Sequence, residues 1–284
     1  MDESRILIIG SSGQLALALK QALPKATSTS RDMLDITNGQ AVADYNWDTI
    51  DTIINASAYT NVGNAETPEG RVEAWRLNGL GVANLARAAA ANNKTLVHVS
   101  TDYVYDGSQT TPYAETDPVA PLGVYAQSKL AGEIAVTVAP KYYVLRTSWL
   151  IGDGPNFVRS IMGLAARDIS PAVVHDQVGR LTFTPMLAEA IVHLLNVKAE
   201  FGTYNVSNIG PTGSWADVAR QIYQDMGRGD LAVTNTTAKE YFADKPDKAP
   251  RPARSTFDLS KIKATGLQLR DWRDDLKKYI AENK

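Results

Sequence analysis

The N-terminal segment constrains the fold more than any other part of the chain, because it combines a buried strand, a glycine turn and a helix. Residues 5–9, Arg-Ile-Leu-Ile-Ile, are typical of a strand buried on both faces. Gly10-Ser-Ser-Gly13 follows, and residues 14–23 have helical apolar spacing. Glycines let the backbone approach a pyrophosphate, to which the helix N-terminus presents free N–H groups. The segment favours a phosphate-binding unit over a plain turn, with expected contacts at Gly10, Ser12, Gly13, Gln14 and Leu15.

Strands and helices alternate over the first 150 residues. Further strands are expected at residues 26–30, 51–55, 95–100 and 142–146, and an alanine-rich helix is expected over residues 73–92. This alternation predicts an α/β fold built on a Rossmann-type, doubly wound parallel sheet.

The pattern loosens after about residue 150. Helices are expected at residues 157–166, 184–197, 214–226 and 271–283, short strands at 172–175 and 203–206, and a loop at 244–254. We therefore expect residues 1–150 to form mainly a dinucleotide-binding Rossmann domain. Residues 151–284 are expected to form mainly a small C-terminal α/β substrate domain, with elements that return to the Rossmann core.

The composition excludes several functional classes. A formal net charge of -2 gives no electrostatic reason to expect nucleic acid or an anionic membrane as a partner. The absence of cysteine excludes disulfides and thiolate nucleophiles. The apolar run at residues 6–9 is too short for a signal peptide or a membrane span. We expect a cytoplasmic protein.

Two further segments are expected to contact the dinucleotide. At the end of the second strand an acidic side chain selects the free 2′-hydroxyl of the adenine ribose and a basic one selects a 2′-phosphate. Arg31 favours NADPH, although it could be a surface charge, and the adjacent Asp32 leaves NADH open. Asp35, followed by Ile36, either caps the next helix or bonds to the adenine region. The small-residue loop after the third strand leaves room for a flat cofactor, with expected contacts at Ala56, Ala58, Tyr59 and Thr60.

The stretch from Ser100 to Lys129 carries the groups for carbonyl chemistry. Tyr125 and Lys129 lie four residues apart on one helix face, so the ammonium can favour the ionised phenol. Ser100 or Thr101, at the end of the preceding strand, can hydrogen-bond the oxygen that the phenol protonates. An ordinary helix pair is the alternative, but Ser100 and Thr101 lie at the sheet edge where the glycine turn is expected.

The chain resembles the extended short-chain dehydrogenase/reductases and, within them, the dTDP-4-dehydrorhamnose reductases, over nearly its whole length. The glycine turn and Tyr-x-x-x-Lys mark only the broad superfamily. More specific strings are Ser-Thr-Asp-Tyr-Val from residue 100, Arg-Thr-Ser-Trp from residue 146, and Asp-Gln-x-Gly from residue 176.

The resemblance implies that a hydride passes from NADPH or NADH to the C4 keto group of a dTDP-4-keto-6-deoxysugar, giving dTDP-rhamnose from dTDP-4-dehydrorhamnose. Tyr125 would protonate the nascent alkoxide, and Thr101 would polarise the keto oxygen. Lys129 would hold the nicotinamide ribose and keep the phenol's pKa low. Residues expected on the substrate side are Thr101, Asp102, Tyr103, Trp149, Asn156 and Arg251. Trp149 could instead be core, and Arg251 could be a loop arginine paired with a carboxylate.

One position discriminates within the superfamily. Sugar-nucleotide dehydratases, which resemble this chain at the same strand end, carry Thr-Asp-Glu, whereas the third residue here is Tyr103. Elimination of water therefore lacks its base. An epimerase, a reductase with another sugar, and a non-catalytic dinucleotide-binding regulatory subunit remain the alternatives.

Three departures from the family pattern bear on ligands. The third glycine of the turn is Ala16, and an acidic residue beyond the small-residue loop is replaced by Gly63. Some members bind magnesium at a dimer interface through glutamates, one of them early in the first helix. That helix offers Leu17-Ala18-Leu19, so we expect no metal and a monomer.

Overall fold

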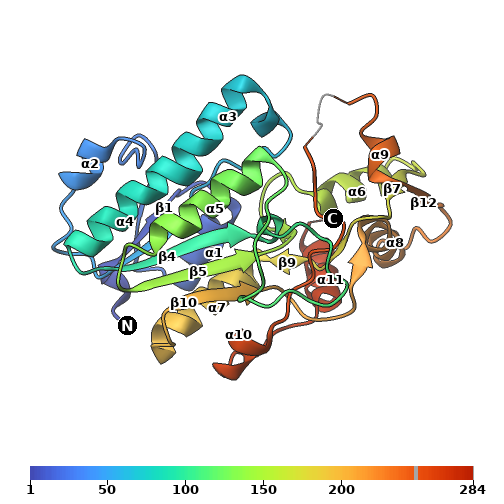
Figure 1. Cartoon of the computed structure of the whole chain (residues 1–284). Coiled ribbons are helices and arrows are strands. Elements are labelled where there is room, and N and C mark those ends of the chain that lie inside the picture. Colours follow the sequence, from blue (N-terminus) through green and yellow to red (C-terminus); the bar gives the residue numbers. More distant parts are fainter. Residues whose placement is uncertain (246–248, 284) are drawn as a thin grey trace.

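The computed structural model describes residues 1–245 and 249–283, and a six-stranded parallel sheet forms its centre (Figure 1). Its strand order is β10-β5-β4-β3-β1-β2. The strands are β1 (Ile6–Ile9), β2 (Thr27–Thr29), β3 (Thr52–Asn55), β4 (Thr95–Thr101), β5 (Tyr142–Thr147) and β10 (Gly202–Val206). The predicted Rossmann-type sheet is confirmed.

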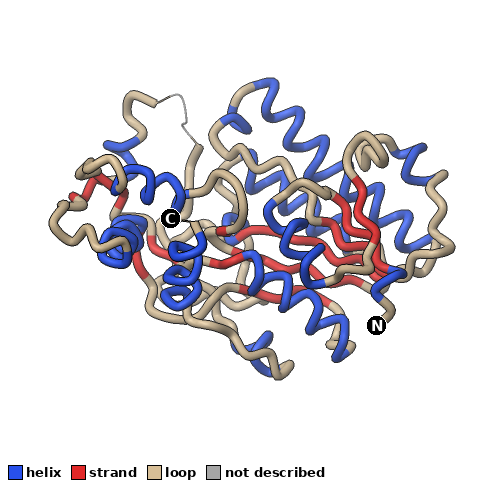
Figure 2. The backbone as a smooth tube through the Cα atoms, turned by 180° about the vertical axis from the view of Figure 1, so that it is seen from behind, coloured by secondary structure: helices blue, strands red, loops and turns tan. Residues whose placement is uncertain are grey.

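Helices cover both faces of this sheet, as the two opposite views show (Figures 1 and 2). Ile6 and Ile8 of β1 pack into one core with helices α1 (Gln14–Ala22) and α7 (Thr184–Val197), whereas Leu7 and Ile9 pack into a second core on the other face. Because successive side chains of a strand alternate, an apolar strand such as β1 supplies both cores. The second face carries α2 (Gly39–Ala43), α3 (Pro68–Ala74), α4 (Val82–Ala91) and α5 (Val124–Val136).

The helix expected at residues 73–92 is longer and irregular. A π-helical segment, Trp75–Gly81, joins α3 to α4. Such segments are rare and occur frequently at functional sites. Short 3-10 turns lie at Glu3–Arg5, Asn64–Glu66 and Asp102–Val104.

Of the two roles expected for Asp35, the cap of the next helix is wrong. Asn38 caps α2 by accepting from the backbone N–H groups of Gln40 and Ala41. Asp35 instead accepts from the backbone N–H and the hydroxyl of Thr37, at 2.9 and 2.8 Å. Asp35 thus closes a local turn before the helix begins.

The C-terminal part packs around a third core. Its helices are α6 (Phe157–Ala165), α8 (Trp215–Asp225), α9 (Ala238–Tyr241) and α11 (Trp272–Glu282), while α10 (Ser260–Ala264) lies against β10. Its strand pairs are β6 (Leu150–Ile151) with β9 (Thr182–Phe183), β7 (Ala172–Val174) with β12 (Thr234–Thr236), and β8 (Val178–Gly179) with β11 (Gly213–Ser214). β10 and α7 return to the Rossmann sheet. The division at residue 150 stays a prediction.

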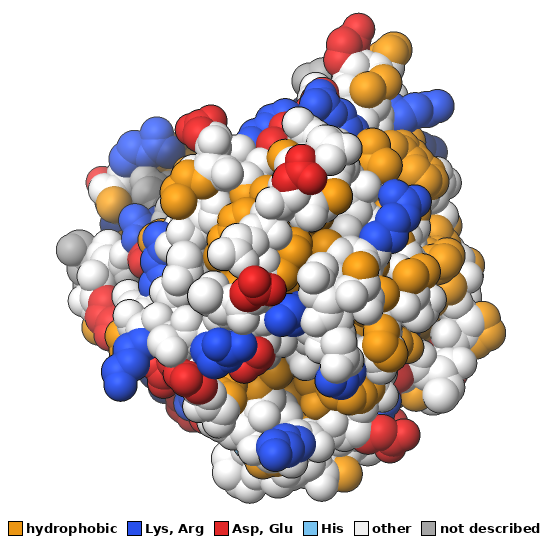
Figure 3. Space-filling model, turned by 90° about the vertical axis from the view of Figure 1, so that its left-hand side faces the viewer, with side chains coloured by type: hydrophobic (Ala, Val, Ile, Leu, Met, Phe, Trp, Pro, Cys, Tyr) orange, Lys and Arg blue, Asp and Glu red, His pale blue; other side chains and the backbone are white. Residues whose placement is uncertain are grey.

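The loop expected at residues 244–254 contains no helix or strand at 244–245 or 249–254, and residues 246–248 lie outside the described residues. No helix within the described ranges has the length and apolar character needed to cross a membrane. On the face that Figure 3 shows, acidic and basic side chains are interspersed with apolar ones.

Candidate active site

A cavity of about 790 Å³ lies at the carboxyl ends of the parallel strands, between the sheet and the C-terminal part. Open parallel sheets bind their ligands at this edge. Many of the predicted site residues line it: Gly10, Ser12, Gly13, Gln14, Leu15, Ala56, Ala58, Thr60, Ser100, Thr101, Asp102, Tyr103, Tyr125, Lys129, Trp149 and Asn156.

The glycine turn closes one end of the cavity. Gly10 has φ +92°, and a Cβ there would lie 2.9 Å from the backbone of Ser57, so a side chain does not fit. Gly13 is the N-cap of α1 and supplies no side-chain cap. The first N–H groups of this nine-residue helix therefore face the cavity without a side-chain acceptor.

The reactive side chains meet on α5 and at the end of β4. The hydroxyl of Thr101 donates to Asp102 Oδ1 at 3.1 Å, and the phenol of Tyr125 lines the same cavity. The Lys129 ammonium is buried and donates to the carbonyl of Val99 at 2.6 Å. Burial raises the pKa of Tyr125 to about 12 and lowers the pKa of Lys129 to about 8.

These pKa directions correct one expectation. Lys129 does not keep the pKa of Tyr125 low in this structure, because burial of the phenol outweighs the other effects and the ammonium is held by Val99. A phenol with this pKa is protonated at neutral pH. Tyr125 is therefore arranged as a proton donor, in the same cavity as the Thr101 hydroxyl.

Asp102 and Tyr103 continue from Thr101 into the same cavity. Burial raises the pKa of Asp102 to about 7, against hydrogen bonds from Ser255 and Thr101 that lower it. The Tyr103 ring meets Tyr125 edge-on, with centroids 6.0 Å apart. Burial raises the pKa of Tyr103 as well. Tyr103 therefore presents a neutral hydroxyl at the third position of the strand-end motif, where a dehydratase would need a glutamate.

An aromatic wall closes the opposite side. Trp149 has φ +44°, and its ring stacks on Trp215 at 3.6 Å. A Cβ on Gly179 would lie 2.9 Å from the Trp149 ring, so this glycine leaves room for the indole. Sequence reasoning missed Trp215. An aromatic residue at the first helical position, inside the capping box of Ser214 and Asp217, was the available signal.

A smaller apolar cavity of about 260 Å³ adjoins this wall. Tyr103, Phe157 and Trp215 line both cavities. Arg251 lies in the smaller one, where its guanidinium is 4.4 Å from the Phe242 ring centre and its charge opposes the rise in the pKa of Tyr103.

Four predicted cofactor residues lie outside the residues that line the main cavity. Arg31 is largely exposed and pairs with Asp35 at 3.5 Å. Ile36 is buried in the second core. The backbone of Tyr59 exchanges hydrogen bonds with the Asn78 side chain, at 2.8 and 3.0 Å. The contacts of these four residues with a cofactor stay predictions.

Asn78 was not selected by sequence reasoning. It lies in the π-helical segment, is buried, and also donates to the Ser128 hydroxyl of α5 at 3.0 Å. It thereby links the loop after β3 to the helix that carries Tyr125. A buried amide needs such partners, so an asparagine inside an alanine-rich helix was a usable signal.

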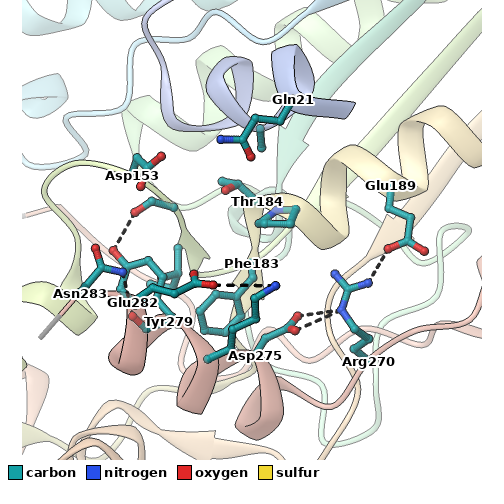
Figure 4. Close-up of a pocket in the computed structure, with 15 residues that line it drawn as sticks. Gln21, Asp153, Phe183, Thr184, Glu189, Arg270, Asp275, Tyr279, Glu282 and Asn283 are labelled. Atoms are coloured by element: carbon teal, nitrogen blue, oxygen red, sulfur yellow. Dashed lines mark hydrogen bonds and ion pairs between the residues drawn. The ribbon is translucent and has the colours of Figure 1, made fainter. Parts of the chain in front are cut away.

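A second cavity, of about 680 Å³, lies beside the first and contains none of the predicted reactive groups (Figure 4). Ile151 and Asp153 line both cavities. Most of its charged side chains pair with one another, Arg270 with Glu189 and Asp275, and Lys278 with Glu282. Helix α1 contributes Ala18 and Gln21. Across the described ranges no group of three or more His, Asp or Glu side chains is arranged to hold a metal.

The chain is similar to known proteins over its whole length. Residues 4–284 match the family model described as the RmlD substrate binding domain. The dTDP-4-dehydrorhamnose reductase of Aggregatibacter actinomycetemcomitans is 37% identical, over 98% of this chain and 99% of that protein. The crystal structure of a dTDP-4-dehydrorhamnose reductase from Clostridium acetobutylicum superposes with a TM-score of 0.91 at 36% identity, covering 98% of this chain and 99% of that one. The reductase of the same name from Bacillus anthracis, solved in complex with NADP, gives a TM-score of 0.87 at 32% identity with the same coverage.

Proposed function

The chain belongs to the RmlD substrate binding domain family, and on this premise we propose that it reduces the C4 keto group of dTDP-4-dehydrorhamnose to give dTDP-rhamnose. It is an NAD(P)H-dependent oxidoreductase. The observation that carries the proposal is that Tyr125, Thr101 and Lys129 line the same cavity as the glycine turn. This arrangement brings a proton donor to the cavity in which the dinucleotide would lie.

The cavity fits a nicotinamide dinucleotide. Four of its buried polar atoms have no hydrogen-bond partner among the described residues: Gln14 Oε1, Ser100 Oγ, Asp102 Oδ2 and Thr147 Oγ1. The uncapped N-terminus of α1 would hold the pyrophosphate, and Lys129 would hold the nicotinamide ribose. When bound, the reduced nicotinamide supplies the hydride.

The chain's own residues complete the reduction. Thr101 and Tyr125 would both hydrogen-bond the keto oxygen, on which negative charge develops as the hydride arrives. Tyr125 would then give its proton to that oxygen and remain as a phenolate until it is reprotonated. The low-dielectric site strengthens each of these interactions.

The substrate would extend from the main cavity into the aromatic wall. Asp102, Tyr103 and Trp149 would contact the sugar. We place the diphosphate near Arg251, whose guanidinium borders the smaller cavity. The side chain of Asn156 caps α6, so a contact with the substrate would have to form in addition to this hydrogen bond.

NADPH is proposed as the preferred cofactor, with NADH as the alternative. Arg31 is exposed enough to bind a 2′-phosphate, but its ion pair with Asp35 would have to break for it to do so. Arg31→Ala should raise the KM for NADPH and leave the KM for NADH unchanged. Equal effects on both cofactors would remove Arg31 from this role.

The reaction itself is tested with purified protein and dTDP-4-dehydrorhamnose. The wild type should oxidise NADPH, and Tyr125→Phe should lose about 10²-fold or more of kcat while still binding NADPH in a fluorescence titration. A wild type that binds NADPH but reduces no keto sugar would contradict the proposal, and so would a Tyr125→Phe variant with full activity.

We further propose that the protein works in the cytoplasm as a monomer without a metal. The first helix places no carboxylate where a bridging glutamate would be needed. Light scattering should give the monomer mass with and without magnesium, and activity should survive a chelator. A magnesium-dependent dimer would overturn this proposal.

A further inference from the structure

Tyr279, five residues before the last residue of the chain, is bonded to both ends of a loop that lines the candidate active site. Its side chain is almost fully buried, at 8% exposure. The hydroxyl donates to the carbonyl of Gly152 at 2.8 Å and accepts from the side chains of Asn156 and Arg159, each at 2.8 Å. A phenol has one donor and two acceptor positions, so all three are occupied.

The loop in question, residues 152–156, forms the wall between the two large cavities. Asp153, Gly154, Pro155 and Asn156 line the cavity that contains the reactive groups. Gly152 passes close to two helices, because a Cβ there would lie 2.6 Å from Thr184 and 3.2 Å from Cβ of Gln14. The loop therefore runs from the start of α1, where the dinucleotide is proposed to bind, to Phe157 and the aromatic wall. Figure 4 shows Tyr279 and Asp153 at this wall from the second cavity.

The middle of the loop has little support of its own. Gly154 has φ +96°, and a Cβ at this position would meet no atom within 4 Å. Asn156 closes the loop internally, since its amide nitrogen lies 2.8 Å from the carbonyl of Gly152 and 3.1 Å from that of Gly154. Tyr279 binds the two residues at which this closure occurs, and it belongs to a helix that packs on the third core.

We propose that Tyr279 is a positioning residue for the active site: from the C-terminal helix its hydroxyl sets the position of loop 152–156 and thereby the affinity for the sugar nucleotide. This inference rests on the proposed function for its kinetic part only. The loop itself can be followed without any substrate.

The test compares Tyr279→Phe with Tyr143→Phe. Tyr143→Phe is the matched control for the loss of one hydroxyl. Tyr143 is buried and donates to the carbonyl of Ala199 at 2.6 Å, away from the cavity. Hydrogen exchange of peptides spanning residues 150–160 should become faster in Tyr279→Phe and stay unchanged in Tyr143→Phe. The KM for dTDP-4-dehydrorhamnose should rise about three- to ten-fold in Tyr279→Phe, with kcat within about two-fold of the wild type, and neither should change in Tyr143→Phe.

Two results would overturn the inference. The first is unchanged hydrogen exchange of the loop in Tyr279→Phe, which would show that the hydroxyl does not hold the loop in place. The second is faster exchange with an unchanged KM, which would mean that the loop position does not affect binding. If the wild type reduces no keto sugar, the proposed function fails, but the exchange result still decides whether Tyr279 holds the loop.

Discussion

Removing one partner of the buried ion pair between Glu133 and Arg146 should destabilise the protein strongly, and far more than replacing both partners by apolar residues. Glu133 lies on α5, one turn beyond Lys129, and Arg146 lies on β5. Their closest atoms are 2.7 Å apart, and the two side chains are only 6% and 7% exposed. The guanidinium also donates to the Tyr105 hydroxyl at 2.7 Å and to the carbonyl of Glu115 at 3.2 Å.

Glu133→Ala leaves the guanidinium of Arg146 buried with only these neutral partners. An uncompensated charge of this kind costs about 3–5 kcal/mol. The matched control is Glu73→Ala on α3, whose pair with Arg76 is 3.8 Å long and 46% and 45% exposed. An exposed pair contributes about 0.2–1 kcal/mol. Both changes replace glutamate by alanine in a helix, so their effects on helix propensity are the same.

Urea unfolding monitored by tryptophan fluorescence measures the difference. We expect the free energy of unfolding to fall by about 3–5 kcal/mol in Glu133→Ala, with an unchanged dependence on denaturant concentration. The double variant Glu133→Leu with Arg146→Met should lose less of the free energy of unfolding than Glu133→Ala, because it buries no unpaired charge. Equal losses in Glu133→Ala and Glu73→Ala would refute this reasoning, as would a double variant less stable than the single.

Three further outcomes are expected. The pKa of Asp102 in the folded protein, about 7, lies above its ordinary 3.8, so folding binds a proton, and stability should fall as pH rises between these values. Asp102→Asn should flatten that dependence in unfolding measured across the range. Trp215→Leu should raise the KM for the sugar nucleotide about ten-fold through loss of the indole stack, whereas Trp75→Leu, at an exposed indole, should not. Gly10→Ala should weaken NADPH binding at least about ten-fold in a fluorescence titration, because its Cβ meets backbone. Gly266→Ala, at the same φ but in open space, should leave the affinity unchanged.

Most elements could be predicted from the sequence because their signals are local. The apolar run of β1, the glycine turn and the 3.6-residue period of α7 each depend on residues within one segment. Capping α2 was one of the two roles expected for Asp35, and Asn38 has it instead, because both residue types close turns and caps. The π-helical segment at Trp75–Gly81 carries no such local signature.

The candidate site could be predicted where its groups follow a strand end or a helix period, as Thr101 and Tyr125 do. Trp215 and Tyr279 were missed because their partners are distant in the sequence: Tyr279 bonds to Gly152 across 127 positions. The pKa of Tyr125 was misjudged for a similar reason. The spacing places Lys129 on the right helix face, but the depth of burial and the competing carbonyl of Val99 depend on the packed structure.

Helix α5 shows why distant polar contacts matter for the chemistry. Apolar packing is not directional, so it holds a helix against a sheet without fixing its rotation. Three polar side chains from separate segments do fix it: Glu66 with the backbone N–H of Val124, Asn78 with Ser128, and Arg146 with Glu133. A slip of one residue would turn the helix by about 100° and move it by about 1.5 Å. Such a slip would carry the Tyr125 hydroxyl away from Thr101, and misplacement by about 1 Å already costs about 10²-fold in rate. The register of α5, and with it the proton donor, therefore depends on residues that take no part in the reaction.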